Sequence, residues 1–257
     1  MLELSHIDLT FSRNSVDSVQ LFRDFSLQVK KGEFLSIVGS NGSGKTTLLN
    51  LICGTLRPDS GTVILNRQDI TAMPEYRRAA WIGRVFQDPK SGTCSELTVL
   101  ENFALADNKG KPYALSSAVS KKRIAVYKEL LASCNMGLED RLNAKVGTLS
   151  GGQRQAIALL LTGMADVDLL ILDEHTAALD PKSSETIMEL TDRLIREKNL
   201  TAVMVTHNLR FAVQYGTRLL MMHDGQIVID KAGAEKAALG VNDLLTTFNQ
   251  ISIECGN

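Results

Sequence analysis

The chain has 257 residues, 44% of them hydrophobic and 22% charged, so a mostly disordered chain is excluded. Its 28 lysines and arginines against 29 aspartates and glutamates give a formal net charge of −1, so we expect no nucleic-acid partner. The apolar stretches are far shorter than the ~20 residues of a membrane-spanning helix, and the first residues lack the pattern of a signal peptide. The 4 cysteines are scattered without metal-binding spacing, which is typical of reduced thiols in a cytosolic protein.

Two kinds of strand are predicted in the first part of the chain. Apolar and polar residues alternate over the first thirty residues, around a polar loop at Ser12–Ser18, which favours antiparallel strands. Phe34–Val38 is a continuous apolar run, as expected for a strand buried on both faces. A helix follows the glycine-rich segment after it and ends at Gly54, and Gly61–Ile70 continues the strands.

The pattern changes to helical between about residues 88 and 160. Apolar residues including Leu97 and Leu105 recur at helical spacing, a basic stretch at Lys109–Arg123 interrupts them, and a second helix is predicted at Ile124–Leu131. Strand patterns return after this region, followed by a helix, a hairpin and a terminal helix. We therefore expect a core formed by residues 1–87 and 161–235, a helical subdomain at 88–160 and a helical tail at 236–257.

Residues 39–46, GSNGSGKT, form a phosphate-binding loop of the GxxxxGK[ST] type. Glycines let the backbone N–H groups face an anion, and the helix that begins there adds positive potential. The Lys45 ammonium group can reach the β- and γ-phosphates, and the Thr46 hydroxyl can ligate Mg²⁺. We expect the nucleotide to be bound by Ser40, Asn41, Gly42, Ser43, Gly44, Lys45, Thr46 and Thr47.

Two acids, Asp173 and Glu174, follow the apolar run Leu169–Leu172. Ligands of parallel sheets bind at the carboxyl ends of the strands. Because successive strand residues point to opposite sides, the two acids are expected to have different roles. We assign Asp173 to the metal and Glu174 to the attacking water as general base; the alternative is a solvated strand end.

Leu149 is followed by Ser150, Gly151, Gly152 and Gln153, directly before an apolar helix. Ser150 and Gln153 have the spacing of a capping box, which is the purely structural interpretation. The two glycines between them favour a second phosphate-binding helix end instead. Since the chain has one phosphate loop, this second end is expected to bind the nucleotide of another subunit.

These three motifs together resemble an ATP-binding-cassette (ABC) ATPase subunit, over roughly residues 2–230. The resemblance implies an α/β P-loop NTPase fold of RecA type, with an N-terminal antiparallel β subdomain and an inserted helical subdomain. It also implies a role for Gln87 in the Q-loop, Asp180 in the D-loop, His207 as the switch histidine and Phe11 in stacking on adenine.

The resemblance also implies a mechanism and partners. Glu174, His207 and Gln87 would be catalytic, and Thr46, Gln87 and Asp173 would hold Mg²⁺. ATP would lie between two copies of the chain arranged head to tail. The dimer would power solute transport through a separate integral membrane permease, at the cytoplasmic face of the membrane, and an extracytoplasmic solute-binding protein is a further expected partner.

One position departs from the family pattern. His175 stands where the family usually has proline, so a titratable residue replaces one that restricts the backbone. The variant DEHTAALD is similar to a subgroup of bacterial importers, some of them associated with amino-acid-type substrates. His6 and His223 have no motif around them and are expected to be surface or packing residues.

A second function stays open at this point. A soluble cassette ATPase can act as a scaffold, for example in iron–sulfur cluster assembly. Chromosome maintenance and translation control are disfavoured, because no long heptad insertion separates the motifs and the chain has one cassette.

Overall fold

The computed structural model describes residues 1–12, 16–110 and 119–254, with side chains up to residue 250. Parts of the predicted Ser12–Ser18 loop and of the Lys109–Arg123 stretch lie outside the described residues. The chain divides into two compact units: unit 1 is Met1–Ala79 with Asn199–Asn257, and unit 2 is Ala80–Lys198.

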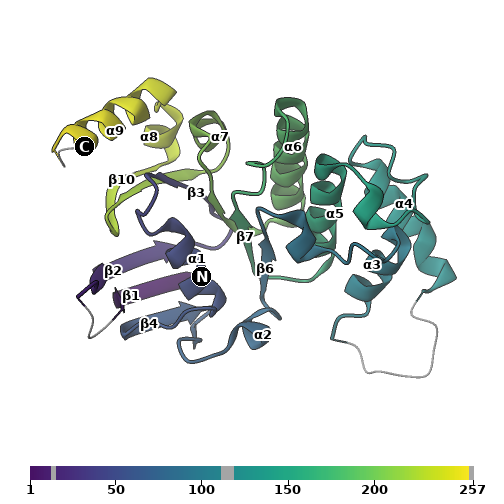
Figure 1. Cartoon of the computed structure of the whole chain (residues 1–257), viewed down its shortest axis with the longest axis horizontal. Helices are drawn as coiled ribbons and strands as arrows, with labels where there is room; N and C mark the ends of the chain where they lie inside the picture. Colours follow the sequence, from purple (N-terminus) through teal and green to yellow (C-terminus); the bar gives the residue numbers. More distant parts are fainter. Residues whose placement is uncertain (13–15, 111–118, 255–257) are drawn as a thin grey trace. The chain divides into compact units, whose positions relative to one another are not determined.

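The first sheet of unit 1 is antiparallel (Figure 1). It has the order β2-β1-β4-β5, formed by β1 (Leu2–Phe11), β2 (Val19–Val29), β4 (Ser60–Leu65) and β5 (Gln68–Asp69). The alternating apolar residues of β1, such as Leu2 and Leu4, are buried, while intervening residues are exposed. The prediction of antiparallel strands at the start of the chain is confirmed.

The second group of strands in unit 1 carries the phosphate loop. β9 (Arg218–His223), β3 (Phe34–Gly39) and β8 (Thr201–Val205) pair in parallel in this order, and β10 (Gln226–Ala232) joins β9 as an antiparallel hairpin. All residues of β3 are buried, as its continuous apolar pattern predicts.

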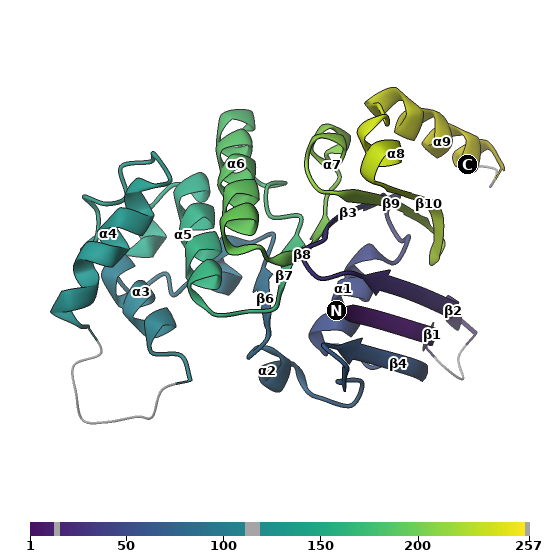
Figure 2. The same ribbon diagram turned by 180° about the vertical axis from the view of Figure 1, so that it is seen from behind.

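Unit 1 also contains helices, which lie between or after its strands along the chain. They are α1 (Lys45–Cys53), α2 (Glu75–Arg78), α7 (Leu209–Gln214), α8 (Gly233–Ala237) and α9 (Val241–Glu254). The predicted end of α1 is confirmed, because Gly54 caps it in the left-handed conformation with φ 85°. On α9, Leu244 is fully buried in a cluster with Val38, Ala212 and Leu219, which fixes the terminal helix beside α7 (Figure 2).

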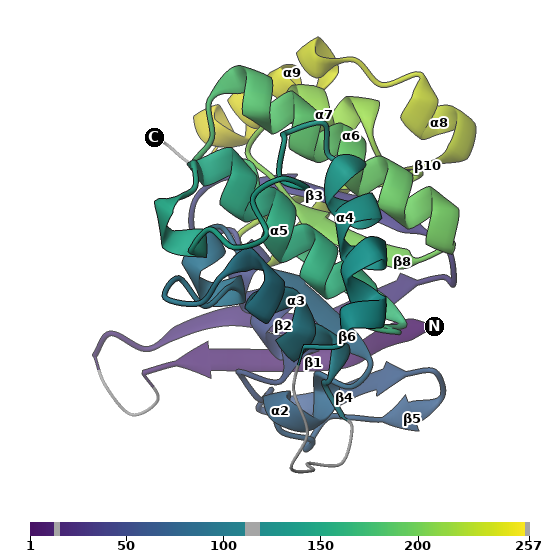
Figure 3. The same ribbon diagram turned by 90° about the vertical axis from the view of Figure 1, so that its right-hand side faces the viewer.

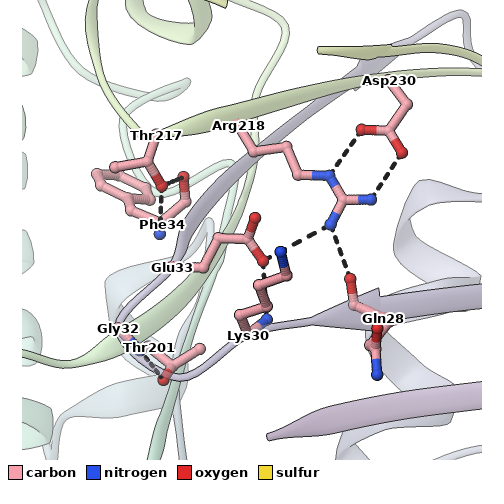
Figure 4. A network of polar contacts seen from close by, with 9 residues as sticks. All are labelled: Gln28, Lys30, Gly32, Glu33, Phe34, Thr201, Thr217, Arg218 and Asp230. Atoms are coloured by element: carbon pink, nitrogen blue, oxygen red, sulfur yellow. Dashed lines mark hydrogen bonds and ion pairs between the residues drawn. The ribbon is translucent and has the colours of Figure 1, made fainter. Parts of the chain in front are cut away.

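A network of polar contacts surrounds Arg218 at the amino end of β9 (Figure 4). Both carboxylate oxygens of Asp230 accept hydrogen bonds of 2.7 Å from Arg218, and Arg218 also donates to the Gln28 carbonyl at 2.8 Å. The hydrogen bonds with Asp230 are the largest cause of a raised pKa of Arg218. These contacts join β2, β9 and β10 at the edge opposite to the one at which β3 enters the phosphate loop.

Unit 2 is formed by two parallel strands and a group of helices (Figure 3). The strands are β6 (Ile82–Val85) and β7 (Leu169–Asp173). The helices are α3 (Val99–Asp107), α4 (Ile124–Ala132), α5 (Gly151–Met164) and α6 (Pro181–Lys198), with 3-10 turns η1 (Pro89–Gly92), η2 (Lys121–Arg123) and η3 (Val146–Thr148). Helix α5 packs against α3, α4, α6 and β6, so it forms the centre of this unit.

The predicted helical region differs from the structure in detail. Leu97 precedes α3, which begins at Val99 behind the capping residue Thr98, and Leu105 is 51% exposed rather than packed inside. The capping box of Thr98 and Glu101 fixes the start of the helix more strongly than the apolar spacing does. In the part of the chain that the structure describes, no helix is both long and apolar enough to cross a membrane.

Candidate active site

The phosphate loop connects β3 to α1 in unit 1. Gly44 is the N-cap of α1 with φ 99°, and no side chain caps the first N–H groups of the helix. A helix start of this kind is suited to bind an anion. Lys45, which is 5% exposed, donates hydrogen bonds to the carbonyls of Gly39 at 2.8 Å and Ser40 at 2.7 Å. The lysine ammonium group is therefore held against the phosphate loop.

The turn between β9 and β10 supports this loop. The Gly225 N–H donates to the Ser43 carbonyl at 3.1 Å, and His223 Nδ1 lies 3.4 Å from Ser40 Oγ. A Cβ atom at Gly39 would lie 2.2 Å from the Met222 carbonyl oxygen, so only glycine permits this approach. His223 is therefore a direct neighbour of the phosphate loop, a place that the sequence analysis missed. Only the tertiary pairing of β9 with β3 reveals it.

His207 lies just after the carboxyl end of β8, at the same end of the parallel strands as the phosphate loop. Strands β3 and β8 pair in parallel with Ile37 opposite Val205, and the Thr206 N–H donates to the Ile37 carbonyl at 3.1 Å. The structure therefore brings His207, which is exposed, to the strand next to β3. Phe11 lies at the end of β1 opposite Val19 and is 39% exposed, so part of this residue is accessible to solvent.

In unit 2, Asp173 and Gln87 lie at or just after the carboxyl ends of two neighbouring strands. Strands β6 and β7 pair in parallel with Val85 opposite Leu172. Asp173 is the last residue of β7, and Gln87 lies two residues after the end of β6. Gln155 of α5 is fully buried and donates from Nε2 to the Phe86 carbonyl at 3.1 Å. This hydrogen bond joins α5, which begins within the LSGGQ motif (Leu149–Gln153), to the residue before Gln87. Gln155 was not among the residues predicted from the sequence.

Glu174 differs from the prediction in its backbone. Strand β7 ends at Asp173, and Glu174 has φ 46°, in the left-handed region. The two acids therefore diverge because the chain turns after Asp173, and the prediction that both lie on the strand was wrong. The Ala177 N–H donates to the Glu174 carbonyl at 2.9 Å, so the turn forms without a proline.

His175 is buried behind this turn. It is 2% exposed, and its Nε2 lies 3.1 Å from the Thr191 hydroxyl on α6. Burial lowers the pKa of His175 to about 4, so the ring is neutral near pH 7. The residue that replaces the usual proline is therefore an internal contact between the turn and α6, and not a titrating group near neutral pH.

An ion pair occupies one oxygen of Asp173. Arg84 Nη2 lies 2.6 Å from Asp173 Oδ2, and the two side chains are only 12% and 13% exposed. The Arg84 guanidinium also lies 4.9 Å from the centre of the Phe86 ring. Arg84 was not predicted as a site residue, because an arginine on a short strand has no motif of its own.

The LSGGQ motif, Leu149–Gln153, contains the capping box that was the purely structural interpretation of its spacing. Ser150 Oγ accepts a hydrogen bond from the Gln153 N–H, and Gln153 Oε1 accepts one from the Ser150 N–H, both at 3.2 Å. A Cβ atom at Gly152 would lie 2.9 Å from Ser183 of α6, so close helix packing explains one of the two glycines. Ser150 itself is exposed, which leaves its hydroxyl at the surface.

Asp180 directly precedes α6 and lies next to this motif. Its Oδ1 accepts a hydrogen bond from the Ser183 N–H at 3.0 Å, and hydrogen bonds with Ser183 lower the pKa of Asp180. The Leu179 side chain lies 3.5 Å from where a Cβ atom of Gly151 would be. Within unit 2, the expected D-loop and LSGGQ residues are therefore neighbours.

Comparison with known proteins identifies the family. The model of the family described as "ABC transporter" matches residues 22–177. The chain belongs to the ABC transporter family. It is 45% identical over 248 residues to a tyrosine transport ATP-binding protein of Clostridioides difficile (strain R20291), covering 96% of this chain and 98% of the relative. It is 36% identical over 203 residues to the thiamine import ATP-binding protein ThiQ of Salmonella choleraesuis (strain SC-B67), covering 79% and 81%.

The fold of an ABC cassette is confirmed by a solved structure. The dimeric post-hydrolysis state of the ATP-binding cassette MJ0796 bound to ADP and Pi matches with a TM-score of 0.76 and 30% identity, covering 90% of this chain and 98% of that one. The chain is thus an ATP-binding, ATP-hydrolysing subunit that powers solute transport through a separate membrane permease. These relationships do not favour the soluble scaffold in iron–sulfur cluster assembly.

Proposed function

We propose that this ABC subunit energises the import of an amino-acid-type solute, with an aromatic amino acid as the first candidate. The observation that carries the proposal is the 45% identity to a tyrosine transport ATP-binding protein, which extends over 96% of this chain. It acts at the cytoplasmic face of the membrane, and its partners are an integral membrane permease and an extracytoplasmic solute-binding protein.

The proposal includes a division of the chain into three parts. These are a core at 1–87 and 161–235, a helical subdomain at 88–160 and a helical tail at 236–257.

The proposed chemistry is the transfer of the γ-phosphoryl group of ATP to water. The Lys45 side chain and the backbone N–H groups at the start of α1 bind the phosphates, and Phe11 stacks on the adenine. Glu174 accepts the proton of the attacking water as the bond between the γ-phosphorus and the bridging oxygen breaks. His207 and Gln87 contact the γ-phosphate and the water. The full set for nucleotide binding is Phe11, Ser40, Asn41, Gly42, Ser43, Gly44, Lys45, Thr46, Thr47, Ser150, Gly151, Gly152, Gln153 and Asp180.

The residues assigned to the cation suit Mg²⁺. Thr46 offers a hydroxyl, Asp173 a carboxylate and Gln87 an amide oxygen, and hard oxygen donors are the ligands that Mg²⁺ prefers. Within the described part of the chain, no three His, Cys, Asp or Glu side chains gather into a group that could hold a metal. At the proposed site, few protein ligands and the nucleotide phosphates would hold the cation, which would neutralise charge in the reaction.

The proposed active form is a head-to-tail dimer of two copies of this chain. Ser150, Gly151, Gly152 and Gln153 of one copy bind the nucleotide held by the phosphate loop of the other. The surface exposure of Ser150 and its place at the start of α5 support this role. ATP then closes the dimer and hydrolysis releases it.

The test is uptake in cells that lack the gene for this chain. Cells supplied with the wild-type chain take up labelled tyrosine, and cells supplied with Lys45→Ala do not, because the variant binds ATP weakly. Labelled thiamine serves as the matched control solute. Uptake of thiamine but not of tyrosine or other amino acids, restored by the wild-type chain alone, contradicts the proposed substrate class. Unchanged affinity of Lys45→Ala for a fluorescent ATP analogue contradicts the assigned phosphate loop.

A further inference from the structure

Arg84 and Asp173 form a nearly buried ion pair in unit 2. Arg84 lies on β6 opposite Ile171 of β7, so it is on the neighbouring strand and two residues short of Asp173. Its Nη2 lies 2.6 Å from Asp173 Oδ2, with both side chains nearly buried. The Phe86 ring, 4.9 Å from the guanidinium group, restricts the arginine on another side. Both the carboxylate and its partner are therefore held in place.

This ion pair weakens the electrostatic attraction between Asp173 and a divalent cation. A cation that approaches Asp173 alone meets a carboxylate whose charge Arg84 already balances, and one of whose oxygens already accepts a hydrogen bond. In a site with little water, the repulsion between the guanidinium group and the cation is weakly screened. Nucleotide phosphates bring additional negative charge, which restores a net attraction for the cation.

We propose that Arg84 is a positioning residue that competes with the divalent cation for Asp173, so that the cation binds only together with the nucleotide. The inference rests on the proposed function, because it takes Asp173 as the residue that holds Mg²⁺. Arg84 gives the carboxylate one fixed orientation and lowers its affinity for a free cation. The chain is thereby prevented from holding a metal ion at Asp173 before ATP arrives.

The test measures metal binding rather than activity. Mn²⁺ is titrated into the purified full chain and its free concentration is followed by electron paramagnetic resonance, with and without ADP. Wild-type protein is expected to bind Mn²⁺ only with ADP. In Arg84→Met the Mn²⁺ concentration for half-saturation with ADP is expected to fall by about tenfold, and binding without ADP is expected to appear. An unchanged or higher half-saturation concentration overturns the proposal.

The matched control is Arg123→Met. Arg123 also combines a carboxylate, Asp107 at 2.7 Å, with an aromatic ring, Tyr127 at 5.6 Å, and it belongs to the same unit. It is expected to leave Mn²⁺ binding unchanged, whereas an equal gain in this variant contradicts a specific role of Arg84. If Arg84→Met does not fold, Arg84→Gln keeps a donor for Asp173 without the charge and is expected to show the same gain.

Asp173→Asn separates this inference from the proposed function. If Asp173→Asn leaves the Mn²⁺ concentration for half-saturation unchanged, Asp173 does not bind the cation. The assignment of Asp173 in the proposed function is then wrong. If Asp173→Asn weakens Mn²⁺ binding while Arg84→Met does not strengthen it, only the competition by Arg84 is wrong. In the double variant the gain from Arg84→Met is expected to be lost.

Discussion

His175 Nε2 donates a hydrogen bond to Thr191 Oγ1 across 3.1 Å, inside unit 2. The direction follows from the Thr191 hydroxyl, whose single proton is donated to the Ile187 carbonyl at 2.7 Å. Thr191 Oγ1 must therefore accept from the ring, which fixes the tautomer of a neutral histidine. Through this bond, α6 holds the turn that begins at Glu174, at the position where the family usually has proline.

Thr191→Val should destabilise the protein by about 1–3 kcal/mol, because the buried N–H group of His175 loses its acceptor while the shape is kept. Thr186→Val is the matched control, since Thr186 on the same helix donates to the Lys182 carbonyl at 3.0 Å. Its effect should stay within about 0.5 kcal/mol. Urea unfolding of both variants measures the difference, and equal effects contradict the assigned contact.

The buried histidine also predicts how stability depends on pH. The pKa of His175 is about 4 in the folded chain, against 6.5 for an unperturbed histidine, so the unfolded chain takes up a proton first as pH falls. The stability from a neutral His175 is full above pH 6.5 and is lost as pH falls towards 4, by up to about 1.4 kcal/mol per pH unit. His175→Phe removes this contribution. The difference in free energy of unfolding between the wild type and His175→Phe should not change with pH above neutral pH, and it should change steeply below it. A difference that does not change over the whole pH range contradicts a buried neutral ring.

Arg78 should matter for the helix that starts at the phosphate loop. It is 1% exposed and donates to the carbonyls of Leu51 at 2.7 Å and Ile52 at 2.8 Å, at the end of α1. Arg78→Met leaves these carbonyls unsatisfied and should cost about 2–4 kcal/mol. Arg77→Met, at an exposed neighbour, should change little. Thermal unfolding measures both, and an equally mild effect of Arg78→Met contradicts its role as a cap.

Ser150→Arg should preserve ATP binding by the monomer but prevent ATP-driven dimerisation, because Ser150 is assigned to the nucleotide of the second copy. The change also removes the cap of α5, worth about 1 kcal/mol. Thr98→Ala is the control, since it removes the corresponding cap of α3 and should still dimerise. Equilibrium binding and light scattering with Mg-ATP measure both properties. Loss of monomer binding in Ser150→Arg would show that the motif acts within its own chain.

Motifs with a strong local signal were predicted well. The strand, loop and helix around Gly39–Thr46 follow from buried apolar residues and glycines. The capping box of Ser150 and Gln153 was the structural alternative for its motif, and the structure contains it. The contacts of Arg84, His223 and Gln155 could not be predicted, because each depends on which strands and helices pair. The backbone turn at Glu174 was missed because adjacent acids after an apolar run resemble a strand end.

The central claim is that Glu174 is the general base of ATP hydrolysis and Asp173 the residue for the cation. Glu174→Gln keeps the size of the side chain and an accepting oxygen, but it cannot take the proton of water, so hydrolysis should fall by ~10²–10⁴-fold. Size-exclusion chromatography with Mg-ATP is the direct measurement: Glu174→Gln should elute as an ATP-bound dimer, whereas Asp173→Asn should bind Mg-ATP weakly and elute as a monomer. Identical elution of the two variants, or hydrolysis by Glu174→Gln at the wild-type rate, would contradict this division of roles.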